Sequence, residues 1–121
     1  MLRRFSVLIF VFIITSCGKS LPELENLDLK TWRNDKNACG NYRSNNIQTI
    51  RSQKEKLLAL DESQIIELLG RPDRNELYKR NQKFFYYYLQ PYTACSSAIE
   101  TTSRLAIRFN AMGLAKEVAI E

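Results

Sequence analysis

The chain of 121 residues contains no histidine, and it has only three cysteines and one tryptophan. Without histidine, Ser-His and Cys-His catalytic pairs and histidine-based metal sites are excluded, and the usual proton carrier near neutral pH is missing. The glycine patterns G-x-x-x-x-G-K-[ST] and G-x-G-x-x-G, which cradle phosphates, do not occur either. We therefore predict a protein that is not an enzyme and that has no cofactor and no bound metal.

Glycine and proline are also sparse, with four and three residues. The apolar content of 45% and the charged content of 26% are typical of folded globular proteins. A chain of this length is too short for two hydrophobic cores. We expect one small domain.

The first sixteen residues have the parts of a secretory signal. Arg3 and Arg4 form a positive start, residues 5–14 are apolar apart from one serine, and small residues follow. The apolar run is shorter than the roughly 20 residues that a transmembrane helix needs. Residues 1–16 are therefore predicted to be a signal peptide, with a buried core helix as the alternative.

Residues 14–17, Ile-Thr-Ser-Cys, resemble the lipobox of bacterial lipoproteins. The resemblance implies that Cys17 becomes the acylated first residue, carrying palmitate-type chains that hold a tether, residues 17–27, at a membrane. Ordinary cleavage near Ser16, with Cys17 as a free thiol, is the alternative. Glycine and lysine follow Cys17, instead of the aspartate that resembles an inner-membrane retention signal. The expected location is the outer membrane; the residues leave both orientations open, and the periplasmic face is our expectation.

The charge of the processed chain is mildly positive. Loss of the two arginines in the signal leaves 16 basic residues against 13 acidic ones, a net charge of +3. This favours anionic lipid or polysaccharide over nucleic acid as a partner, or simply a soluble surface. A basic stretch around the first expected hairpin has two readings: a phosphate-binding patch, or a solvated edge that discourages strand pairing between molecules. It comprises Arg71, Arg74, Lys79, Arg80 and Lys83.

Two cysteines remain after Cys17, and in an oxidising compartment an even remainder indicates a disulfide. Cys39 and Cys95 are the expected partners. A zinc site or a redox pair is the alternative. The absence of histidine argues against zinc, and the wide spacing of the two cysteines argues against a redox pair.

Helical signals occupy the first half of the chain. Asp28 is a suitable N-cap for a helix to about residue 36, and three-and-four spacing of apolar residues predicts a second helix over residues 45–59. Asp61 and Gln64 form a capping box that starts a third helix. Gly70 is expected to end that helix in the left-handed conformation.

From residue 76 the apolar period changes to two, which predicts strands. Strands are expected at 77–78, 83–89, 103–109 and 116–121, with a turn and a left-handed glycine at 110–113. Helices followed by strands indicate an α+β fold. We predict one domain over residues 28–121, with N-terminal helices on one face of a three- to four-stranded antiparallel sheet.

The order of these signals resembles a known family. Residues 60–73 resemble the helix and L-G-x-P-D segment of the SmpA/OmlA (BamE) family, and residues 84–89 and 105–113 resemble its aromatic strand and final hairpin. The resemblance covers about half of the chain. It implies the family's fold of two helices on a three-stranded antiparallel sheet, within the β-lactamase-inhibitor-protein-like superfamily.

The resemblance also implies a function. The expected role is that of a lipid-anchored bacterial envelope protein, scaffolding or modulating an outer-membrane protein complex as a barrel-assembly accessory. The alternative is an envelope inhibitor or ligand-binding lipoprotein of the same superfamily. A small hydrolase is the third hypothesis, since paired carboxylates can cleave glycosidic bonds, but capping, helix-dipole and turn roles explain most of the densest acids. These acids are Asp61, Glu62, Glu67 and Asp73.

The aromatic strand is the best candidate for a partner surface. Residues 83–89 are aromatic on both faces, although a sheet covered by helices on one face normally has polar residues on the other. Either residues 90–102 cover the second face, or it is an exposed site for a protein or an anionic lipid headgroup. The candidate surface comprises Phe85, Tyr87, Arg104 and Arg108.

Overall fold

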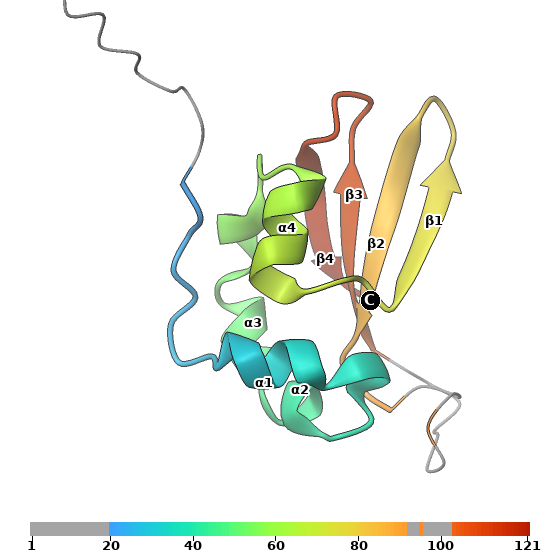
Figure 1. Ribbon diagram of the computed structural model, residues 1–121. Helices are drawn as coiled ribbons and strands as arrows, with labels where there is room; N and C mark the ends of the chain where they lie inside the picture. The colour runs from blue at the N-terminus through green and yellow to red at the C-terminus, as the bar shows by residue number, and fades with distance from the viewer. Residues whose placement is uncertain (1–19, 92–94, 96–102) are drawn as a thin grey trace, which may run out of the picture.

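The computed structural model describes residues 20–91, 95 and 103–121 (Figure 1). The predicted signal peptide, Cys17 and most of the expected covering loop lie outside the described residues. The elements are α1 (Leu29–Asn34), η1 (Lys36–Ala38), α2 (Tyr42–Asn45), α3 (Ile47–Arg51), η2 (Lys54–Leu57), α4 (Glu62–Leu69), β1 (Arg74–Tyr78), β2 (Gln82–Tyr88), β3 (Arg104–Phe109) and β4 (Ala115–Ile120). Helices followed by antiparallel strands confirm the α+β fold.

The four strands form one antiparallel sheet in the order β1-β2-β3-β4. Arg80 and Asn81 turn the chain from β1 to β2 with positive φ angles of 61° and 60°. Between β3 and β4, the side chain of Asn110 accepts hydrogen bonds from two later backbone N–H groups, and Gly113 has a φ of 79°. A positive φ is available to glycine at little cost, so this turn forms as predicted.

Helices and strands share one hydrophobic core. Figure 1 shows the helices gathered on one side of the sheet. Full burial of one large apolar side chain contributes about 1.5–3 kcal/mol, so this cluster is the main source of stability. Its members include Trp32, Ile50, Leu57, Leu60, Ile65 and Leu69 from the helical half, and Phe85, Tyr87, Leu89, Leu105, Ile107 and Phe109 from the sheet and the residue after β2.

The helix α4 begins and ends at the predicted residues. The Asp61 carboxylate accepts the Gln64 N–H at 2.8 Å, and the Gln64 side chain accepts the Asp61 N–H at 2.9 Å, which confirms the capping box. At the other end, Gly70 has φ 82° and ψ −178°: its φ is positive as predicted, but its ψ is not that of a left-handed helical residue. The prediction was wrong in this detail because the chain leaves the helix directly toward the sheet.

The predicted helix over residues 45–59 is wrong: the structure divides this segment among α2, α3 and η2. Asn46 and Gln53, at the two breaks, both have a φ of −121°. Their side-chain amides donate to the carbonyls of Tyr42 and Thr49, at 2.8 and 3.0 Å. Side chains that compete for main-chain carbonyls in this way favour turns over a continuous helix.

The segment expected to be a tether is partly folded. Leu24 is only 6% exposed and belongs to the core. The Glu25 N–H donates to the Gln53 side chain at 2.6 Å, and the Lys56 ammonium donates to the Glu23 carbonyl at 3.0 Å. The domain therefore begins about four residues before the predicted start, because the short helices leave a gap that Leu24 fills.

One edge of the sheet is partly occupied. The Ala59 N–H donates to the Ala115 carbonyl, and the Ala115 N–H donates to the Leu60 carbonyl, each at 2.8 Å. The Lys54 ammonium reaches the Val118 carbonyl at 3.2 Å. These contacts cover part of the outer edge of β4, whereas β1 forms the other edge of the sheet.

Candidate functional site

The sheet face that points away from the core carries side chains from all four strands. Phe85 and Tyr87 point into the core, so Phe84 and Tyr86 must point to the opposite face. The antiparallel register aligns one row across that face, namely Glu76, Phe84, Arg108 and Glu117. We call this surface the open face; it comprises Glu76, Tyr78, Gln82, Phe84, Tyr86, Arg104, Arg108, Glu117 and Glu121.

The open face holds a shallow groove of about 560 Å³. Aromatic rings from β1 and β2 and charged groups from β3 and the C-terminal residues line it. Its lining consists of Glu76, Leu77, Tyr78, Gln82, Phe84, Tyr86, Arg108, Glu117 and Glu121. A surface with apolar rings and both signs of charge offers contacts to a partner that is itself partly polar.

The aromatic rings of the open face form a packed column. The rings of Phe84 and Tyr86 are parallel, with centroids 5.6 Å apart, and Tyr78 meets Phe84 edge-on at 5.5 Å. The guanidinium of Arg104 lies 3.9 Å from the Tyr86 ring centroid. Burial raises the pKa of the Tyr86 hydroxyl above its ordinary value. The four side chains of the column thus pack against one another across β1, β2 and β3.

The arginines of the open face are paired with acids. Arg104 contacts Glu121 at 2.8 Å, and Arg108 contacts Glu117 at 3.1 Å. Arg108 also donates to the Gln82 side chain at 3.1 Å. Pairs as exposed as these contribute about 0–1 kcal/mol each to stability, so a partner's charges can replace them at little cost.

The structure divides the candidate surface that we predicted from the sequence. Arg104 and Arg108 lie on the open face, but Phe85 and Tyr87 are only 2% and 0% exposed and belong to the core. Their assignment to a partner surface was wrong because alternation alone does not say which row of aromatic residues the helices cover. The pairing of Phe84 with Arg108 in the register identifies the row on the open face, where Phe84 is half-buried and Tyr86 is only 5% exposed.

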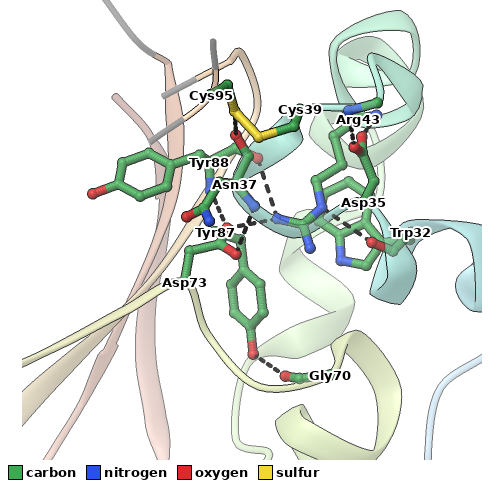
Figure 2. A network of polar contacts seen from close by, with 11 residues as sticks. Trp32, Asp35, Asn37, Cys39, Arg43, Gly70, Asp73, Tyr87, Tyr88 and Cys95 are labelled. Carbon is green, nitrogen blue, oxygen red and sulfur yellow. Dashed lines mark hydrogen bonds and ion pairs between the residues drawn. A yellow bond between two sulfur atoms is a disulfide. The ribbon is translucent and has the colours of Figure 1, made fainter. Parts of the chain in front are cut away.

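A buried arginine, Arg43, lies where the helices meet β2 (Figure 2). Arg43 is 1% exposed, and its guanidinium contacts the Asp73 carboxylate at 2.6 Å. It also donates to the carbonyls of Trp32 and Tyr88, at 3.1 and 3.4 Å. The Trp32 ring centroid is 4.8 Å from the guanidinium. Sequence analysis missed this group, because the residues that compose it are far apart in the chain.

The two acids near Arg43 accept hydrogen bonds from the backbone. Asp73 accepts the N–H groups of Asn37 and Tyr88, at 3.0 and 2.8 Å. Asp35 accepts the N–H groups of Gly40 and Arg43, at 2.5 and 2.9 Å. Every charge in the group is thus compensated, as stable burial requires. The arrangement joins α1, α2 and the start of β1, and its role is structural.

A disulfide joins Cys39 and Cys95 next to this group, with the two Cα atoms 5.6 Å apart (Figure 2). The Cys95 sulfur lies 3.6 Å from the Asn37 carbonyl oxygen. The bridge attaches the chain after β2 to the end of η1. It therefore connects the sheet and the helical layer covalently. The Arg43 group connects the same two layers through an ion pair and hydrogen bonds.

The acids considered for hydrolysis are mostly engaged in structure. Asp61 caps α4, Glu62 pairs with Lys83 at 2.8 Å, and Asp73 is bound by Arg43. Glu67 is exposed on α4. Over residues 20–91, 95 and 103–121, the structure contains no group of three or more side chains suited to hold a metal ion. None of the helices in that part of the chain has the length and apolar character to span a bilayer.

Comparison of the chain with protein-family models, with curated proteins and with solved structures finds no match in any of the three.

Proposed function

We propose that the protein is a non-enzymatic, lipid-anchored component of the bacterial envelope, which scaffolds or modulates an outer-membrane protein complex through the open face. The observation that carries the proposal is the row of aromatic and charged side chains on a sheet face without covering helices. The resemblance of residues 60–121 to the SmpA/OmlA (BamE) family adds the barrel-assembly machinery as the complex to test first.

The expected anchor lies close to the folded domain. Leu24 is the first residue in the core, seven positions after Cys17. A fully extended chain spans at most about 3.3–3.6 Å per residue, so the domain lies within roughly 25 Å of the acylated residue. The partner must therefore present its site near the membrane surface, which favours a membrane protein complex.

The composition of the open face fits a protein partner. Tyrosine, phenylalanine and arginine are enriched in the cores of interfaces, where they contribute most of the binding energy. Here Phe84, Tyr86 and Arg104 pack against one another, with Tyr86 only 5% exposed. Phe84 and Arg104 would therefore meet a partner from ordered positions and lose little conformational entropy on binding. The paired arginines and glutamates around them would set the specificity and orientation of the complex more than its affinity.

Site-specific photo-crosslinking in intact cells tests the proposal. A photoreactive amino acid replaces Gln82 or Glu117 on the open face, and exposed Asn45 on α2 is the matched control. We expect crosslinks to an outer-membrane protein, with the barrel-assembly components examined first, from the open-face positions and not from the control. Equal crosslinking from all three positions, or none, contradicts the proposal. Mass spectrometry of the N-terminal peptide tests acylation of Cys17 separately.

The groove of about 560 Å³ favours one alternative, an envelope inhibitor or ligand-binding lipoprotein. An inhibitor of this kind would present the sheet to a target enzyme. In that case, crosslinks from position 82 identify a soluble envelope enzyme, and the purified protein lowers the turnover of that enzyme. Capture of a membrane complex without an effect on turnover supports scaffolding instead.

A further inference from the structure

Exposed apolar side chains gather at one end of the molecule. Leu77 and Met112 are the most exposed large apolar residues of the described chain, at 84% and 83%. Tyr78 is 54% exposed and Leu114 is 36% exposed. All four lie in or beside the two turns of the sheet, the turn between β1 and β2 and the turn between β3 and β4. Exposed apolar residues this concentrated mark a contact site.

The topology places both turns at the same end. Because β1, β2 and β3 are successive antiparallel neighbours, β1 and β3 run in the same direction and finish at the same end of the sheet, with β2 between them. Figure 1 shows the two turns together at the top of the sheet. We call residues 77–81 and 110–114 the hairpin end.

The charge of the hairpin end has one sign. Lys79 and Arg80 are exposed in the first turn, and neither of the two segments contains an acidic residue. Within the described part of the chain, neither cation forms an ion pair. Acids beside the two segments have other partners: Glu76 pairs with Arg74, Glu62 pairs with Lys83, and Asp61 caps α4. Apolar side chains flanked by unpaired cations suit the interface of an anionic bilayer.

The start of the described chain lies toward the same end. In Figure 1 the blue segment at the start of the described chain runs along the helical side of the molecule down to α1, and its first residues lie nearer the level of the two turns than α1 and α2 do. Ser20 is three residues after Cys17, which limits the distance between them to about 11 Å. An acyl chain on Cys17 would thus hold this end, rather than the α2 end, near the membrane.

We propose that the hairpin end is a second membrane contact, with a bilayer that carries anionic phospholipid as its partner. Leu77 and Met112 enter the boundary between headgroups and acyl chains, Tyr78 lies at headgroup level, and Lys79 and Arg80 bind phosphates. Two short turns present far less surface than the roughly 800 Å² per partner of a standard protein interface, which disfavours a second copy as the occupant. The inference rests on the proposed lipid anchor for delivery to the membrane.

Depth measurements on the full processed protein, purified from membranes and reconstituted into vesicles, test this contact. Leu77→Cys, Met112→Cys and the control Asn45→Cys each carry an environment-sensitive fluorophore; the disulfide occupies Cys39 and Cys95. With vesicles of phosphatidylethanolamine and phosphatidylglycerol, we expect a blue shift and quenching by spin-labelled lipid at positions 77 and 112. The fluorophore at position 45 should remain in water.

The charge is tested with K79Q/R80Q, matched by K36Q/R51Q, which removes two exposed cations elsewhere. Each cation near an anionic surface raises the membrane binding constant about fivefold. The first variant should therefore lower the equilibrium constant for docking on the membrane by about 25-fold, and the second should leave it unchanged. Equal effects of the two variants would overturn the electrostatic part of the proposal.

The remaining outcomes separate this inference from the proposed function. If positions 77 and 112 stay in water although mass spectrometry shows an acylated Cys17, the membrane contact is wrong and the anchor stands. If Cys17 proves unmodified, Cys17→Ser is added so that only the introduced cysteine carries the fluorophore, and the labelled chains are added to preformed vesicles. A blue shift there supports the contact without the anchor. A blue shift that instead follows protein concentration in the absence of lipid indicates self-association and overturns the proposal.

Discussion

The guanidinium of Arg43 on α2 lies 2.6 Å from the carboxylate of Asp73, which precedes β1, and neither side chain is more than 3% exposed. Thirty positions separate the two residues in the chain. The pair therefore joins the helical half to the sheet inside the protein, where an unpaired charge is expensive.

Arg43→Met should lower the free energy of unfolding by about 3–5 kcal/mol, because it leaves the Asp73 carboxylate buried without its cation. Arg43→Lys should recover only part of the loss, since an ammonium cannot reproduce the planar contacts with Trp32 and Tyr87. Urea unfolding near neutral pH measures both values. Arg74→Met, which removes a half-exposed pair with Glu76, is the control and should cost no more than about 1 kcal/mol. A similar cost for Arg43→Met and the control would contradict the structural role of the buried pair.

Removal of the disulfide should lower stability by an amount set by the length of the loop it closes. Cys39 and Cys95 are 56 positions apart, for which the chain-entropy model gives on the order of 4 kcal/mol. The double variant C39S/C95S and the reduced wild type should therefore unfold at similar, lower urea concentrations. Reductant should change the gel mobility of the wild type and leave the double variant unaffected. If reductant leaves the wild-type transition in place, the bridge contributes nothing to stability.

Tyr87 should make stability depend on alkaline pH. Burial raises the pKa of its hydroxyl well above the ordinary value of 10.0, and the hydroxyl donates to the Gly70 carbonyl at 2.7 Å. Above about pH 10 the unfolded chain loses this proton while the native state keeps it. The stabilising contribution is thus complete below pH 10 and falls as the pH rises beyond it.

Tyr87→Phe should cost about 1 kcal/mol at neutral pH, through the lost hydrogen bond, and should flatten the decline in stability above pH 10. Urea unfolding at a series of pH values measures both effects. Exposed Tyr78→Phe is the matched control and should keep the alkaline slope of the wild type. An unchanged slope in Tyr87→Phe would show that other groups cause the decline.

Gly70→Ala should be destabilising by about 1–3 kcal/mol. The residue combines φ 82° with ψ −178°, a conformation nearly restricted to glycine, and an added Cβ would lie 2.9 Å from the Arg33 side chain. Gly113→Ala provides the comparison: φ is 79° there, but the nearest atom would be 3.9 Å away, so backbone strain acts alone. Thermal or urea unfolding should show that Gly70→Ala is less stable than Gly113→Ala. If Gly113→Ala is the less stable variant, the steric argument is wrong.

Local signals predicted the elements whose ends are set by neighbouring residues. The capping box at Asp61 and Gln64 needs only four consecutive residues, and the alternation in β3 needs only six. The turn before Gly113 likewise depends on residues within it. Such features are visible in the sequence because the groups that interact are also close along the chain.

The rest depends on contacts between distant residues. From the sequence alone, Asp73 is interpreted as a turn residue, because its partner Arg43 lies thirty positions earlier in the chain. Tyr87 belongs to a strand that is aromatic on both faces, and only the positions of the helices decide which face is buried. The breaks at Asn46 and Gln53 arise from side-chain hydrogen bonds that a count of apolar residues does not register.

The contacts of Ala59 and Leu60 with Ala115 have a consequence for assembly. A fibre built by strand addition requires every molecule to offer two unpaired borders, one for each neighbour. Here the outer edge of β4 is already partly hydrogen-bonded to Ala59 and Leu60 of the same chain. Growth through β1 would then stop at a pair of molecules, so strand addition would not extend into a fibre.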